Sequence, residues 1–140
     1  MSKHETWRTR QYWKAKGGLL IEEFKVVKRG EKNSIRLIDG VIVLGEENSI
    51  HSSTYFDISG RDIICIQTKK SRLGMYVMGQ AFFSRELLKR HNPKSIKSVI
   101  ICGKEDSVLQ ELCTNNEIEV VVIPEKTQLD KKFREKKQTS

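Results

Sequence analysis

The pattern of apolar and polar positions divides the chain into a strand-rich first half and an alternating strand–helix second half. Three runs rich in β-branched residues predict strands at residues 19–28, 34–44 and 61–68. The third run is apolar at nearly every position, which is typical of a strand buried on both faces. From residue 75 to 91 the apolar positions recur at four- and five-residue steps, which predicts a helix that ends before Pro93.

The remaining elements follow from the same patterns. A partial apolar stripe predicts a first helix over residues 5–16, stopped by two glycines, and later segments predict a strand, a helix and a strand at 96–102, 105–113 and 118–123. The polar stretch 45–60 is expected to be a loop with a short extended piece around Tyr55-Phe56. Short connections favour antiparallel pairing of the first three strands, and the helical crossovers favour parallel pairing of the later ones. The expected fold is a mixed α/β sheet in the order α-β-β-β-α-β-α-β.

Size and composition place this pattern in one ordinary domain. The chain has 140 residues, 37% hydrophobic and 31% charged, and residues 1–125 carry all of the core-forming pattern. Residues 126–140 are expected to be a basic, flexible C-terminal tail. No apolar run approaches the ~20 residues of a membrane span, and the first residues lack a signal core, so we expect a cytoplasmic protein without a membrane partner. The odd cysteine count favours buried free thiols.

The net charge of +8 is concentrated at the two ends of the chain. Residues 1–16 hold five cations and one acid, residues 126–140 hold six cations and two acids, and the segment between them is balanced. Basic ends around a neutral core favour a polyanionic partner, with nucleic acid as the common example. The alternative is a solubilising surface with a basic tail.

Polar side chains stand in two of the predicted strands at positions where a metal site could form. Asp39 lies inside the second strand, and Gln67 and Lys69 lie two residues apart in the third, so they share a face. If the strands pair, the carboxylate, the amide oxygen and the ammonium group meet at one point. Magnesium prefers oxygen ligands, and a lysine can orient water or neutralise the charge that develops on a phosphate under attack.

An acid on one strand followed by acid-x-Lys on the next resembles the PD-(D/E)XK nuclease superfamily, which has the restriction-endonuclease-like fold. Ile38-Asp39 stands in for the first half of that motif and Gln67-Thr68-Lys69 for the second, and the expected element order matches the family core over residues 5–123. The resemblance implies a metal-dependent nuclease that uses Mg²⁺ or Mn²⁺ and acts on nucleic acid, with DNA favoured over RNA and RNA left open. Cutting of two strands favours a homodimer.

The chain departs from the family pattern at residue 67, where glutamine replaces the usual acid. A neutral amide oxygen binds a hard dication more weakly than a carboxylate does, so a further acid is expected in the site. Glu23 on the first strand is the favoured one, as a catalytic residue and metal ligand with Asp39 and Gln67. Supporting positions are expected at Glu5, Glu22 and Gln80. For each of these residues, an ordinary solvated position is the alternative.

Cations near these positions are candidates for nucleic-acid contact. Lys70 and Arg72 directly follow the motif strand, and Arg8, Arg10 and Lys14 alternate with aromatic residues in the first helix. Packing of Trp7 and Trp13 against the sheet is the favoured role for these aromatics. Two other functions stay open: a nuclease-fold module that binds nucleic acid or a partner protein without efficient cleavage, and an unrelated nucleotide-binding domain, although no glycine-rich phosphate loop follows a strand.

Overall fold

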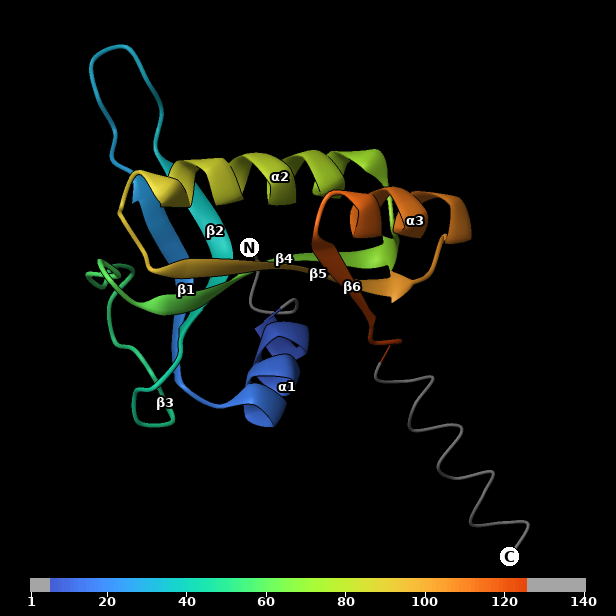
Figure 1. Cartoon of the computed structure of the whole chain (residues 1–140), viewed down its shortest axis with the longest axis horizontal. Helices are drawn as coiled ribbons and strands as arrows, with labels where there is room; N and C mark the ends of the chain where they lie inside the picture. Colours follow the sequence, from blue (N-terminus) through green and yellow to red (C-terminus); the bar gives the residue numbers. More distant parts are fainter. Residues whose placement is uncertain (1–5, 126–140) are drawn as a thin grey trace, which may run out of the picture.

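A six-stranded mixed sheet with helices on both faces forms the body of the protein, as the computed structural model of residues 6–125 shows (Figure 1). The strands lie in the spatial order β3-β1-β2-β4-β5-β6. In chain order the elements are α1 (Thr6–Lys16), β1 (Leu19–Val27), β2 (Arg36–Val43), β3 (Ser49–Ile50), β4 (Asp62–Arg72), α2 (Met75–Lys89), β5 (Ser95–Lys104), α3 (Ser107–Asn115) and β6 (Ile118–Val122).

The direction of each strand pair follows from the length of its connection. β1, β2 and β4 pair antiparallel, whereas β4, β5 and β6 pair parallel through the crossover helices α2 and α3. Helix α1 covers one face of the sheet, and α2 and α3 cover the other (Figure 1). The predicted mixed α/β sheet and both predicted pairing directions are confirmed.

Each face of the sheet has its own apolar core. On the α1 face, Tyr12 packs with Ile64 and Ile66 of β4, and Trp7 and Trp13 are partly buried against them, as predicted for the two tryptophans. On the α2 face, the side chains of β1 and β2 pack with Ile63, Cys65 and the helix residue Leu88. Odd-numbered residues of β4 therefore face α2 and even-numbered residues face α1, which fixes where the polar end of this strand points.

Two sequence predictions about the strands differ from the structure. The extra strand β3 lies at Ser49–Ile50, where it pairs with Leu19 and Leu20 of β1, so the prediction of an extended piece at Tyr55-Phe56 is wrong. Strand β4 continues to Arg72 instead of ending near Thr68. Its last residues are exposed but still pair with β5. Glu5 and the basic segment 126–140 lie outside the described residues.

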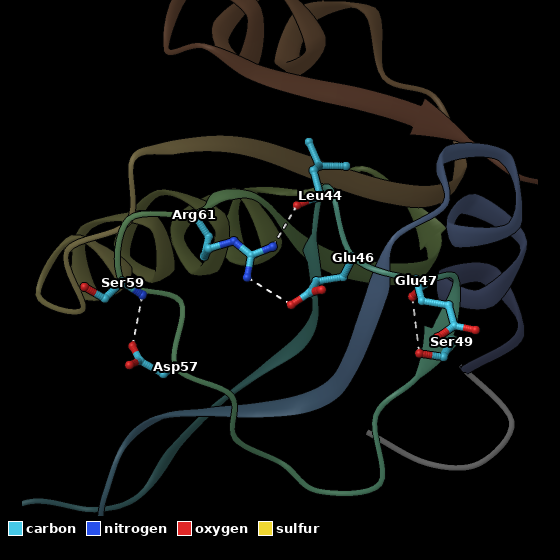
Figure 2. Close-up of polar contacts among 7 residues, drawn as sticks. All are labelled: Leu44, Glu46, Glu47, Ser49, Asp57, Ser59 and Arg61. Atoms are coloured by element: carbon cyan, nitrogen blue, oxygen red, sulfur yellow. Dashed lines mark hydrogen bonds and ion pairs between the residues drawn. The ribbon is translucent and has the colours of Figure 1, made fainter.

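Polar contacts fix the long connection between β2 and β4. The guanidinium of Arg61 donates to the carboxylate of Glu46 at 3.0 Å and to the carbonyl of Leu44 at 3.3 Å, and Ser59 N donates to Asp57 Oδ1 at 3.0 Å (Figure 2). The contacts of Arg61 tie the start of β4 back to the end of β2, whereas the Asp57–Ser59 contact is local to the connection. The Arg61 contacts therefore help to fix the position of the two strands that carry the candidate motif.

The three cysteines are free and buried, as predicted. Burial raises the pKa of the Cys65 thiol to about 12, and the negative charge of Asp39 adds to this effect. Burial also raises the pKa of Cys102 and Cys113. None of the three is poised as a thiolate nucleophile. Among residues 6–125, no helix is long and apolar enough to cross a membrane.

Candidate active site

The carboxylate of Asp39 lies where β2 stops pairing with β4. The paired residues of these strands run from Val43 and Ile63 to Gly40 and Ile66. At the next position, Asp39 Oδ2 accepts a hydrogen bond from the backbone N–H of Thr68 at 2.9 Å and another from its hydroxyl at 3.1 Å. Hydrogen bonds of the Asp39 side chain thus take the place of backbone pairing between β2 and β4 at this position. They hold Asp39 against Thr68, in the middle of the Gln67-Thr68-Lys69 segment.

Glu23 lies beside Asp39 at a distortion shared by β1 and β2. The pairs Glu22–Gly40 and Phe24–Ile38 enclose the two acids, and Glu23 has a left-handed φ of 51°. Such a φ is uncommon for a residue other than glycine and costs conformational energy. The structure therefore places the two residues that the sequence proposed as metal ligands at facing positions on neighbouring strands.

The distortion reverses the alternation of both strands. In β1, Ile21 and Phe24 are three residues apart, yet both pack in the core on the α2 face; Ile38 and Val41 of β2 behave in the same way. In a regular strand, side chains of one face are separated by an even number of residues. Because both strands change together, their pairing continues on either side of the two acids.

Gln67 uses its amide in a different contact from the one predicted. Its side chain is 3% exposed and turns toward α2, where Nε2 donates to the hydroxyl of Ser84 at 2.7 Å. Lys69, on the same face by strand alternation, is exposed at the end of the sheet. By the same alternation the Thr68 hydroxyl that holds Asp39 faces α1, whereas Gln67 and Lys69 face α2, so the predicted meeting of Asp39, Gln67 and Lys69 at one point is not confirmed. Asp39 binds Thr68, the residue between the other two, and the amide of Gln67 is bonded to a helix.

Glu22 faces the opposite side of the sheet from Gln67. Its carboxylate accepts two hydrogen bonds from the guanidinium of Arg10 in α1, at 2.9 and 3.0 Å. This bidentate pair raises the pKa of Arg10. Both residues therefore fix α1 to β1, and Glu22 has a structural partner at the position where a supporting role in the site was expected.

Arg8 is a structural residue in this fold, which corrects its interpretation as a nucleic-acid contact. It is 2% exposed, its Nε donates to the carbonyl of Ile123 at 2.9 Å, and Nη2 donates to the carbonyl of Lys70 at 3.4 Å. The guanidinium also lies 4.4 Å from the centre of the Trp7 ring and 3.4 Å from Glu125. Its charge is buried between α1 and the ends of two strands.

Other predicted cations do lie at the surface. Lys14, Lys70 and Arg72 are exposed. Lys70 and Arg72 line a depression of about 620 Å³ at the carboxyl ends of β4, β5 and β6, together with Lys104. Arg72 donates to the carbonyl of Glu105 at 2.8 Å, which fixes the rim of this depression.

A second groove, of about 320 Å³, lies on the α2 face, with Gln67 in its lining. Gln80 of α2 also lines this groove, so the helix amide that the sequence singled out lies close to the motif amide. The opposite wall comes from the two strand segments that lead into the β1–β2 turn, including Arg36. The motif strand is therefore accessible from this side of the sheet.

The side chains at the distortion fit a hard divalent cation that takes only one or two ligands from the protein. Asp39 and Glu23 offer two carboxylates on adjacent strands, and magnesium usually takes one or two carboxylates and keeps several waters. Within residues 6–125, no group of three or more His, Cys, Asp or Glu residues could form an all-protein metal cage. The donor set thus suits a metal that shares its coordination with water and substrate, and it does not suit a structural zinc.

Sequence reasoning missed two residues that shape this region. Thr68 was treated as the spacer of the motif, but it supplies both donors to Asp39. Ser84 was not considered, although it holds the amide of Gln67. A small hydroxyl on an otherwise apolar helix face was the available signal for Ser84, since buried hydroxyls need polar partners.

The comparisons with known proteins identify no relative. The chain matches no protein-family model, no curated protein and no solved structure.

Proposed function

We propose that the protein is a metal-dependent phosphodiester hydrolase that acts on nucleic acid, with DNA as the favoured substrate. The observation that carries the proposal is the position of Asp39, which lies next to Glu23 on one side and is bonded to the Gln67-Thr68-Lys69 segment on the other. Apart from the two-residue β3, the order of the elements is that expected of a PD-(D/E)XK core, which supports the same reading.

The residues would divide the chemistry as follows. Asp39 and Glu23 would hold Mg²⁺ or Mn²⁺, which when bound polarises the scissile phosphate. Thr68 holds the carboxylate of Asp39 in a fixed orientation through two hydrogen bonds. The ammonium group of Lys69, exposed at the end of the sheet, would orient the attacking water or neutralise charge on the phosphate. Gln67 is held by Ser84 and would supply its amide from the groove side.

The test is cleavage of plasmid, single-stranded and branched DNA with magnesium or manganese. We expect Asp39→Asn, Glu23→Gln and Lys69→Gln each to reduce the rate at least about 100-fold, the size of effect typical for removal of a positioned charged group. The matched controls are Asp57→Asn and Lys94→Gln, which change the same charges on exposed residues outside the site. Parent-like cleavage by both Asp39→Asn and Lys69→Gln would show that the site is wrongly assigned.

A second function is favoured by one specific observation. Gln67 carries a neutral amide, and its Nε2 is bonded to Ser84, so this position lacks the negative charge that the family pattern supplies to the metal. A module with this site would bind nucleic acid without efficient cleavage. Salt-dependent DNA binding with no cleavage in either metal would support this function and contradict the hydrolase.

A further inference from the structure

The groove on the α2 face has two walls of different chemistry. One wall is a stripe of α2 with residues three or four positions apart, which places them on the same side of the helix: Tyr76, Gln80, Phe83 and Leu87. The other wall is the base of the β1–β2 hairpin, formed by Val26, Ile35, Arg36 and Leu37. The hairpin turn extends beyond the level of α2, so it rises beside the helix as an arm (Figure 1).

The hairpin arm is strongly basic and exposed. The arm carries four cations and one acid, and all five side chains are exposed: Lys28, Arg29, Lys32, Arg36 and Glu31. Within the described residues, Lys32 and Arg36 make no ion pair with an acid. An unneutralised basic arm beside a groove matches the backbone of a polyanion in charge.

The helix wall exposes large apolar side chains that the core does not use. Tyr76 is 79% exposed and Phe83 is 65% exposed, and Leu37 on the opposite wall is 45% exposed. Single exposed apolar residues are ordinary, but two aromatic rings and a leucine around one groove form a contact surface. Flat rings beside a positive arm are the combination with which proteins hold unstacked bases.

We propose that this groove binds unpaired nucleotides, so that the substrate of the proposed hydrolase is single-stranded nucleic acid or a structure with a single-stranded segment. The reaction in this inference, phosphodiester hydrolysis, rests on the proposed function, whereas the class of substrate rests on the groove. The hairpin arm contacts the phosphates, and Tyr76 and Phe83 stack on successive bases. Gln67 forms part of the same groove, so a strand held there lies against the motif strand β4.

Binding is measured by fluorescence anisotropy with a labelled oligothymidine in EDTA, so that cleavage does not contribute. Tyr76→Ala and Phe83→Ala are each expected to weaken single-strand binding roughly 5- to 100-fold, the loss typical of one stacking contact. The matched control is Met75→Ala, which removes a 73%-exposed apolar side chain from the same helix outside the groove. It is expected to bind as the parent does.

The basic arm is tested separately through salt dependence. Arg36→Gln and Lys32→Gln are each expected to lower the slope of log affinity against log salt by about 0.7 for a single strand. The control is Lys94→Gln, an exposed cation distant in sequence from the arm. An unchanged slope in both arm variants would overturn the role of the hairpin.

Four outcomes separate this inference from its rivals. Equal loss of duplex and single-strand binding in Tyr76→Ala, or no loss of either, would overturn it. A concentration-dependent dimer that Tyr76→Ala abolishes would also overturn it, because the patch would then be covered by a second copy of the chain. Single-strand binding that depends on Tyr76 and Phe83 in a protein that does not cleave would support the groove and contradict the hydrolase alone.

Discussion

Replacement of Gln67 by glutamate tests the motif most directly, because it supplies the acid that the resemblance leads one to expect. The side chain is 3% exposed and donates to Ser84 at 2.7 Å. A protonated carboxyl group can donate to the same hydroxyl, whereas an ionised one would carry its charge in a buried position. We therefore expect Gln67→Glu to fold with the new carboxyl group protonated and with its pKa raised above the ordinary value.

The size of the effect follows from the cost of protonation. In the unfolded chain the new group has a pKa of about 4.3, so holding it neutral at pH 7 costs about 1.36 kcal/mol for each of about 2.7 pH units, or about 3.7 kcal/mol. The pKa of the new carboxyl group is higher in the folded protein than in the unfolded chain. The free energy of unfolding of the variant is therefore highest below pH ~4.3 and decreases as the pH rises. The expected deficit relative to the parent is near zero at pH ~4 and about 4 kcal/mol at pH 7.

Urea denaturation at a series of pH values measures this difference, with and without magnesium. The control is Gln80→Glu, which makes the same exchange at an exposed position in the same groove and should change stability by less than about 0.5 kcal/mol. A deficit below about 1 kcal/mol at pH 7, or one that does not vary with pH, would refute the burial argument. Magnesium should reduce the deficit of Gln67→Glu only, and no such reduction would place residue 67 outside the metal site.

Three further predictions concern the scaffold. Arg8→Met should lower the free energy of unfolding by about 3 kcal/mol in urea titrations, because it leaves the carbonyl of Ile123 without its charged donor, and a loss under about 1 kcal/mol would contradict the structural role. Gly103→Ala should destabilise the protein by about 2 kcal/mol or more, because the new methyl group would collide with the carbonyl of Lys70. Gly79→Ala, in the open middle of α2, should instead stabilise it by about 0.5–1 kcal/mol. Melting temperatures equal to that of the parent would contradict both expectations. Cys65 should stay unreactive toward a thiol reagent at pH 8 in the folded protein and react on unfolding; rapid native labelling would be inconsistent with its burial and raised pKa.

The apolar pattern predicted the long elements because burial determines them. The pattern could not locate β3, whose two exposed residues carry no period and are extended only because they pair with β1. It also ended β4 too early, since Lys69 and Arg72, on either side of an irregularity in the strand, are held by backbone pairing to β5 rather than by apolar side chains. Backbone hydrogen bonds of this kind leave no trace in side-chain chemistry.

The candidate site was predictable in position but not in its bonds. The sequence placed Asp39 on one strand and Gln67 and Lys69 on another, and the structure pairs these two strands. The left-handed backbone at Glu23 and the burial of Arg8 were not visible, because both depend on partners distant in the chain. Arg8 in particular binds the carbonyls of Lys70 and Ile123, 62 and 115 residues away, and backbone carbonyls are available from every residue type.

Glu23 and Asp39 are the extra residues at the shared distortion of β1 and β2, so a change in the number of residues at either position alters how the two strands of the hairpin align. If Glu23 alone were deleted, β1 would alternate regularly while β2 kept its extra residue, so Asp39 would be left as an unpaired bulge opposite β1. If Glu23 and Asp39 were deleted together, the two strands would realign as a plain ladder, with Phe24 and Ile38 still directed at α2. Such a double deletion is the shortest route from this chain to a protein that keeps its sheet and has lost its pair of carboxylates.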